Sequence, residues 1–79
     1  MNMREEVEKR LTDVRLQRDE AEAEATRAAE DLIRAAGGIA PLRETDPDQV
    51  RAAADAFAGA LQRLRMLEEF ARNLRSLLM

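Results

Sequence analysis

The chain has 79 residues, of which 37% are charged, and its formal net charge is −3 with acidic and basic residues interspersed. A chain of this length makes one small domain at most. The absence of cysteine excludes disulfides, thiolate catalysis and cysteine-based metal sites, and the mildly acidic balance disfavours non-specific binding to nucleic acid.

Residues 4–36 carry the pattern of one long amphipathic helix. Their apolar residues recur at alternating spacings of three and four, which places them on a single face, and no glycine or proline occurs before Gly37. This apolar seam consists of Val7, Leu11, Val14, Ala21, Ala25, Ala28, Leu32 and Ala35. Its middle is alanine, so it lets a partner helix approach closely but buries little area per residue.

Arg18 is the one charged residue in this seam, and it allows two interpretations. An ion pair from Arg18 would fix the register or the choice of partner. Alternatively, its aliphatic stem covers the seam while the guanidinium reaches solvent. We favour the second interpretation because long basic side chains adopt this arrangement readily.

A break between two helices is expected over residues 37–46. Gly37 and Gly38 supply left-handed backbone positions that end a helix, and Pro41 prevents regular helix from continuing. We expect Ile39 and Leu42 to fold back over this end of the molecule and close its core.

Asp46 is the expected N-cap of a second helix over residues 47–78. Pro47 then occupies the first helical position, and Gln49 completes a spacing similar to a capping box. The second seam is apolar throughout and consists of Val50, Ala53, Phe57, Ala60, Leu64, Leu67, Ala71, Leu74 and Leu78.

The two helices have similar lengths and a short connection, which predicts an all-α fold with one antiparallel, coiled-coil-like αα-hairpin over residues 1–79. If the helix ends are flush, Glu20 lies near Arg63, and Arg15 lies near Glu68 and Glu69. The largest expected core side chains are Val7, Leu11, Val14, Leu32, Val50, Phe57, Leu64, Leu67, Leu74 and Leu78.

A flank of the second helix carries apolar side chains that one partner helix cannot cover. Met66, Phe70 and Leu77 lie about 80–100° from the seam, and Gly59 on the same flank would permit close approach. Because exposed apolar patches usually mark interfaces, we expect two hairpins to form a homodimeric four-helix bundle through these four residues.

Nothing in the sequence predicts a catalytic, cofactor or metal site. Carboxylates are the abundant reactive groups, but Glu20, Glu22 and Glu24 do not share one helix face. The chain has no histidine, which a carboxylate-bridged di-iron bundle would use. We therefore expect a non-enzymatic protein.

The first residues show no apolar signal segment, and no stretch is apolar enough to span a bilayer, so we expect a cytoplasmic location.

Binding of RNA by one face of the bundle is a weaker alternative. The second helix carries five candidate arginines, which are Arg51, Arg63, Arg65, Arg72 and Arg75. Acidic residues interrupt them and no aromatic stacking group accompanies them, so we do not expect a nucleic-acid partner.

Part of the second helix resembles a known family. The segments that carry the resemblance are Pro47-Asp48-Gln49-Val50, Ala60-Leu61-Gln62 and Met66-Leu67-Glu68. They are similar to the second helix of the small E-type co-chaperones of type III secretion needle subunits, over about 25 residues. The resemblance implies a helical hairpin that pairs with a tetratricopeptide-like co-chaperone and keeps a secretion subunit soluble. It therefore offers an alternative function, a co-chaperone or adaptor that folds on a different helical protein.

Overall fold

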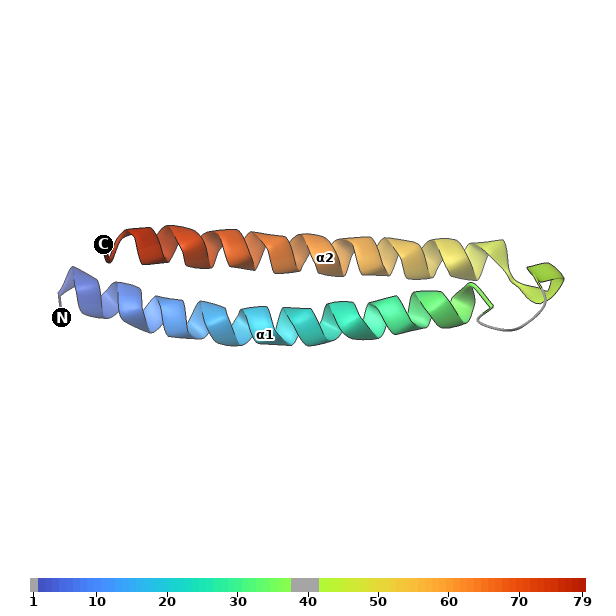
Figure 1. Cartoon of the computed structure of the whole chain (residues 1–79), viewed down its shortest axis with the longest axis horizontal. Helices are drawn as coiled ribbons and strands as arrows, with labels where there is room; N and C mark the ends of the chain where they lie inside the picture. The colour runs from blue at the N-terminus through green and yellow to red at the C-terminus, as the bar shows by residue number, and fades with distance from the viewer. Residues whose placement is uncertain (1, 38–41) are drawn as a thin grey trace.

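The computed structural model describes residues 2–37 and 42–79, which form two long antiparallel helices lying side by side (Figure 1). Helix α1 spans Met3–Ala35, the short 3₁₀ helix η1 spans Leu42–Glu44, and helix α2 spans Pro47–Ser76. The described residues contain no strand. The prediction of an all-α helical hairpin is confirmed. Each end of α1 comes one residue earlier than expected, and α2 ends two residues earlier.

The first helix begins with a cap that the sequence analysis overlooked. The side-chain oxygen of Asn2 accepts a hydrogen bond from the Glu5 backbone N–H at 2.8 Å. This contact satisfies one of the N–H groups that a helix start leaves without a partner. Asn2 followed three residues later by Glu5 is itself a capping signal, and it accounts for the start at Met3.

The end of α1 uses Gly37 as expected. Gly37 has a φ of 101°, in the region that only glycine adopts without strain. Its N–H donates to the carbonyl of Arg34 at 3.1 Å. Gly38, Ile39 and Pro41 lie outside the described residues.

At the start of α2, Asp46 is the N-cap and Pro47 is the first helical residue. The Asp46 carboxylate accepts a hydrogen bond from the Asp48 backbone N–H at 2.9 Å. The donor is the residue before Gln49, which the capping-box spacing had indicated. The expected fold-back of Leu42 is wrong, because its side chain is 83% exposed. Leu42 lies in η1, outside the region where the two long helices meet.

The core is concentrated at the end of the hairpin that holds both chain termini (Figure 1). Val7, Leu11 and Val14 of α1 are buried against Ala71 and Leu74 of α2, with Leu67 and Leu78 packed beside them. In the middle of α1, the small residues Ala21 and Ala25 are buried. The other predicted core residues are only half-buried, namely Leu32, Val50, Phe57 and Leu64. Packing therefore weakens toward the turn.

The ion pairs between the helices are not the ones expected from aligned helix ends, although Arg15 does lie near Glu68. Arg63 pairs with Glu24 rather than Glu20, and Glu68 pairs with Arg18 rather than Arg15. Both observed partners lie three or four residues further along α1, and Figure 1 shows the start of α1 projecting beyond the end of α2. Seam packing sets the register, since the connection is long enough to let one helix overhang the other.

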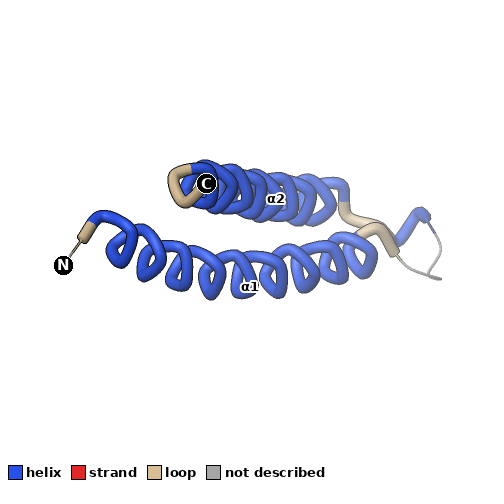
Figure 2. The backbone as a smooth tube through the Cα atoms, turned by 60° about the vertical axis from the view of Figure 1, so that its left-hand side comes forward, coloured by secondary structure: helices blue, strands red, loops and turns tan. Residues whose placement is uncertain are grey.

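The molecule is a rod of 61 × 16 × 13 Å with a radius of gyration of 17.8 Å. A compact domain of this length would have a radius of gyration of about 12 Å. Figure 2 shows that α1 curves along its length beside α2. The elongated shape leaves both helices with long outward faces.

Candidate interaction surface

The C-terminal half of α2 exposes large apolar side chains away from the hairpin core. Met66 is 65% exposed, Phe70 is 46% exposed and Leu77 is 58% exposed. Gly59 lies on the same flank and is also exposed. The structure thus places all four predicted interface residues on the outside of the hairpin.

These residues belong to a longer pattern that the sequence analysis missed. Exposed positions continue at alternating spacings of four and three along the whole flank, about 100° from the core seam. We call this set the second stripe: Ala52, Ala56, Gly59, Arg63, Met66, Phe70, Asn73 and Leu77. The signal was available in the sequence, but the alanines and the two polar residues obscured it.

Gly59 has no role in closing the hairpin itself. A Cβ atom built on Gly59 would meet no other atom within 4 Å, so the core does not need a residue without a side chain there. Glycine inside a helix costs about 1 kcal/mol relative to alanine. The small surface that it leaves therefore faces outward, within the second stripe.

A stripe of charged residues on α1 runs beside the second stripe. Phe70 shares a hollow with Glu6, Arg10, Asp13 and Gln17, and the Arg63 guanidinium donates to the Glu24 carboxylate at 3.2 Å. These contacts place both stripes on the same side of the hairpin. The charged stripe consists of Glu6, Arg10, Asp13, Gln17, Glu20, Glu24, Arg27, Asp31 and Arg34, all exposed.

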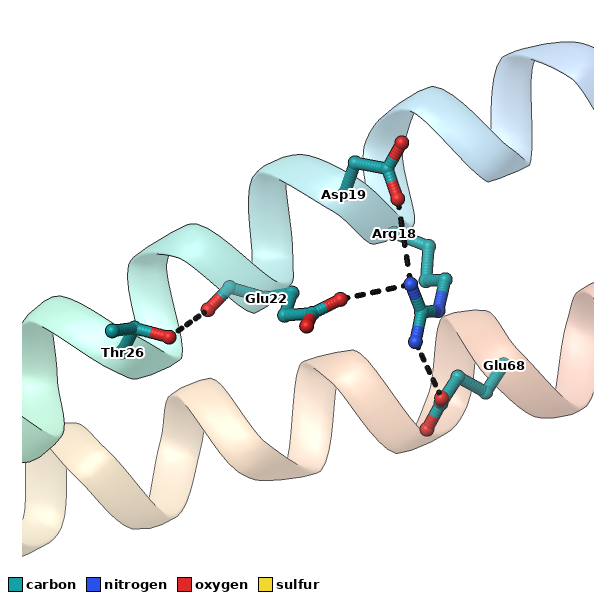
Figure 3. A network of polar contacts seen from close by, with 5 residues as sticks. All are labelled: Arg18, Asp19, Glu22, Thr26 and Glu68. Carbon is teal, nitrogen blue, oxygen red and sulfur yellow. Dashed lines mark hydrogen bonds and ion pairs between the residues drawn. The ribbon is translucent and has the colours of Figure 1, made fainter.

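The opposite side of the hairpin carries the Arg18 network (Figure 3). The Arg18 guanidinium donates to Glu22 at 2.8 Å and to Asp19 at 3.4 Å on its own helix, and to Glu68 of α2 at 3.2 Å. The guanidinium lies at the partly exposed edge of the seam, in line with the interpretation that we favoured, but it is also bonded to the other helix there. Arg18 forms the inter-helix ion pair of the other interpretation.

The charge of Arg18 is held firmly by these neighbours. The hydrogen bond with Glu68, followed by the attraction of the Glu22 charge, raises the pKa of the Arg18 guanidinium above its usual value. The side chain is 35% exposed, which places it at the edge of the seam rather than within it. Arg18 joins the two helices by bonding to Glu68 of α2, and the apolar seam is interrupted at its position.

We expect Arg18→Leu to raise the melting temperature by about 5 °C, because a seam leucine buries apolar area whereas partly exposed ion pairs contribute little. Thermal unfolding followed by circular dichroism measures this change. Glu30→Leu is the control, since Glu30 is exposed on the same helix and lies outside the seam, and it should leave the melting temperature unchanged. A fall in the melting temperature of Arg18→Leu would show that the ion network contributes more than seam packing.

Beside this network, Arg15, Arg72 and Arg75 line a hollow with Arg18 and Glu68. Glu68 neutralises part of the positive charge there.

Within residues 2–37 and 42–79, no group of three or more acidic side chains is arranged to hold a metal ion. In the same part of the chain, neither long helix has an apolar stretch sufficient to cross a membrane.

The second stripe is therefore the most distinctive surface of the hairpin, with the charged stripe beside it. No family model matches the chain, and neither a curated protein nor a solved structure does.

Proposed function

We propose that this chain is a non-enzymatic protein–protein interaction module that self-associates through the second stripe of α2. The observation that carries this proposal is the exposure of Met66, Phe70 and Leu77 in one row on a rigid helix. Water-exposed apolar side chains gain free energy when a partner covers them, at roughly 25 cal/mol per Å². Aromatic residues and methionine are also enriched in the centres of protein interfaces.

The weakness of the hairpin core supports self-association. Only Ala71 and Leu74 of α2 are buried, so the seam contributes little packing over the half of the rod near the turn. A chain this small has marginal stability unless it gains further buried area. Association would add that area where the hairpin alone lacks it.

Sedimentation equilibrium at micromolar concentration tests the proposal. We expect a dimer of the 8.9 kDa chain that dissociates into monomers on dilution. A stable, fully helical monomer across that concentration range would contradict self-association.

A second candidate is an adaptor that folds on a different helical protein, as the resemblance to secretion co-chaperones implies. The half-buried seam from Val50 to Leu64 favours it, because a heterologous helix could complete this part of the core. It predicts weak helicity for the isolated chain and a gain of helicity on mixing with the partner. Full helicity in a homodimer would favour the first proposal instead.

A further inference from the structure

We propose that the second stripe binds the same stripe of a second copy in antiparallel orientation, with Phe70 of each copy packed over Gly59 of the other. This inference rests on the proposed self-association. It adds the direction of the helices, their register and the charges that meet across the dimer.

Residue size along the stripe favours antiparallel pairing. The N-terminal half is small at Ala52, Ala56 and Gly59, and the C-terminal half is large at Met66, Phe70 and Leu77. Antiparallel pairing sets Phe70 and Leu77 against small residues, and it sets Met66 against Arg63, whose aliphatic stem can cover it while the guanidinium stays bonded to Glu24. When Phe70 lies over Gly59, the spacing brings Leu77 over Ala52. The open space around the missing Cβ of Gly59 then receives an aromatic ring.

The two other simple arrangements fit this surface less well. Parallel pairing of the stripes would stack Phe70 on Phe70 and leave a gap between the two small halves, and interiors tolerate few such voids. Packing the second stripe on α1 of a second copy would bury Met66 and Phe70 against the charged stripe, where charges would lose water without apolar contact in return.

The exposed area of the hairpin matches what such a dimer needs. The chain exposes 6225 Å², whereas a compact monomer of the same mass exposes about 4,800 Å². The excess of roughly 1,400 Å² per copy exceeds the ~800 Å² that each partner contributes to a standard stable interface. This excess is spread over the whole rod, and the proposed pairing would bury the part of it that lies along α2.

The charged stripes supply an independent argument for the same register. A two-fold axis perpendicular to α2 keeps both α1 helices on one side of the α2 pair, so the two charged stripes become neighbours. Leu11, Val14, Ala71 and Leu74 pack in one cluster, and we infer that Leu11 lies level with Leu74 and Val14 with Ala71, because this alignment joins the two seams position by position. The contact of Phe70 with Gly59 fixes how the two α2 helices align, and the layers within each hairpin then fix how the two α1 helices align. The charged stripes of the two copies therefore face each other in antiparallel order.

Opposite charges then meet near both ends of that contact, whereas at its centre Glu20 faces its own copy and Gln17 faces Glu24. Near each end, the register opposes Glu6 with Arg34, Arg10 with Asp31, and Asp13 with Arg27, and symmetry repeats each pair. A shift by one helical turn would instead oppose Arg10 with Arg34 and Asp13 with Asp31. Complementary charges of this kind mainly select register and direction rather than adding affinity.

Glu20 lies closest to the two-fold axis in this arrangement, because it is at the middle of the charged stripe. Arg10 and its symmetry copy lie about 30 Å apart along the helix axis, while Arg10 lies beside Asp31 of the second copy. These separations differ completely from those of a parallel dimer, in which each residue lies beside its own copy.

Single cysteine variants test this geometry, because the chain has no cysteine of its own. Cross-linking with a short bismaleimide should join most of the Glu20→Cys protein into covalent dimers. Arg10→Cys and Asp31→Cys should not link when each is alone, but should link when the two variants are mixed. Arg15→Cys, on the opposite side of α1, is the control and should not link.

The outcomes separate this inference from the proposed function. If sedimentation shows only monomer, self-association itself is wrong. If sedimentation shows a dimer but Arg10→Cys or Asp31→Cys links alone, or Glu20→Cys does not link, the antiparallel register is wrong and self-association stands.

Gly59→Leu gives a second test that does not depend on cross-linking. The added side chain should displace Phe70 of the second copy and weaken the dimer by about tenfold or more. It should also raise the helicity of the monomer, because leucine is a better helix former than glycine. Ala58→Leu, at the adjacent exposed position, should leave the dimer intact. An unchanged dimer in Gly59→Leu would overturn the contact with Phe70.

Discussion

Phe70→Asp dissociates the dimer and leaves the hairpin largely helical, if the second stripe is the interface. The substitution would place an unpaired charge in a contact that excludes water, which is strongly unfavourable. Truncation of a central aromatic residue commonly costs about 2–4 kcal/mol of binding free energy, so we expect the dissociation constant to rise by about 100-fold. In the lone hairpin Phe70 is 46% exposed, so most of the helix should survive.

Sedimentation equilibrium and far-ultraviolet circular dichroism on the same samples measure the two effects. Leu16→Asp is the matched control, since Leu16 is 60% exposed on α1 and lies away from both the core seam and the charged stripe. It should remain dimeric. If Leu16→Asp dissociates the assembly and Phe70→Asp does not, the interface lies on the outer face of α1.

The sequence contained enough information to predict the hairpin because helical periodicity is a local property. The alternation of three and four residues defined both seams, and Gly37 and Asp46 marked the helix ends through backbone requirements of single positions. The exact helix boundaries depend on individual cap contacts, which the periodicity does not define. The cap formed by Asn2 was legible in the sequence but was overlooked.

The register could not be predicted because it depends on how two faces pack, not on either helix alone. Aligning the helix ends placed Glu20 beside Arg63, whereas the seams pair so that Glu24 is the partner. Arg18 shows the same limitation. Its carboxylate partners include Glu68, fifty positions away in the chain, and only the packed hairpin brings them together.

The second stripe was found in part for a related reason. Met66, Phe70 and Leu77 are conspicuous in the sequence because they are large and apolar, while Ala52 and Ala56 lie at matching spacings but resemble ordinary helix surface. Their significance depends on a second copy of the chain. The size difference between the two halves of the stripe acquires a physical meaning only when the helices run in opposite directions.

Leu74→Asp should unfold the hairpin rather than dissociate it. Leu74 is 6% exposed and packs in the cluster with Val7 and Leu11. Replacing a buried leucine with alanine already costs about 2–5 kcal/mol, and an unpaired buried carboxylate adds a desolvation penalty. A chain of 79 residues has a total stability of roughly 4–12 kcal/mol. We therefore expect a largely unfolded protein at 25 °C, measured as loss of helical circular dichroism.

The same substitution should have a graded effect along the seam, because packing weakens from the termini toward the turn. Leu64→Asp and Val50→Asp alter half-buried positions, where the new carboxylate keeps part of its hydration. At concentrations where the hairpin is monomeric, denaturant unfolding should therefore rank the loss of stability as largest at Leu74, smaller at Leu64 and smallest at Val50. Equal losses at all three positions would mean that the core is uniform in solution, which requires a partner covering the turn half of the rod. A larger loss at Val50 than at Leu74 would contradict the placement of the core at the terminal end.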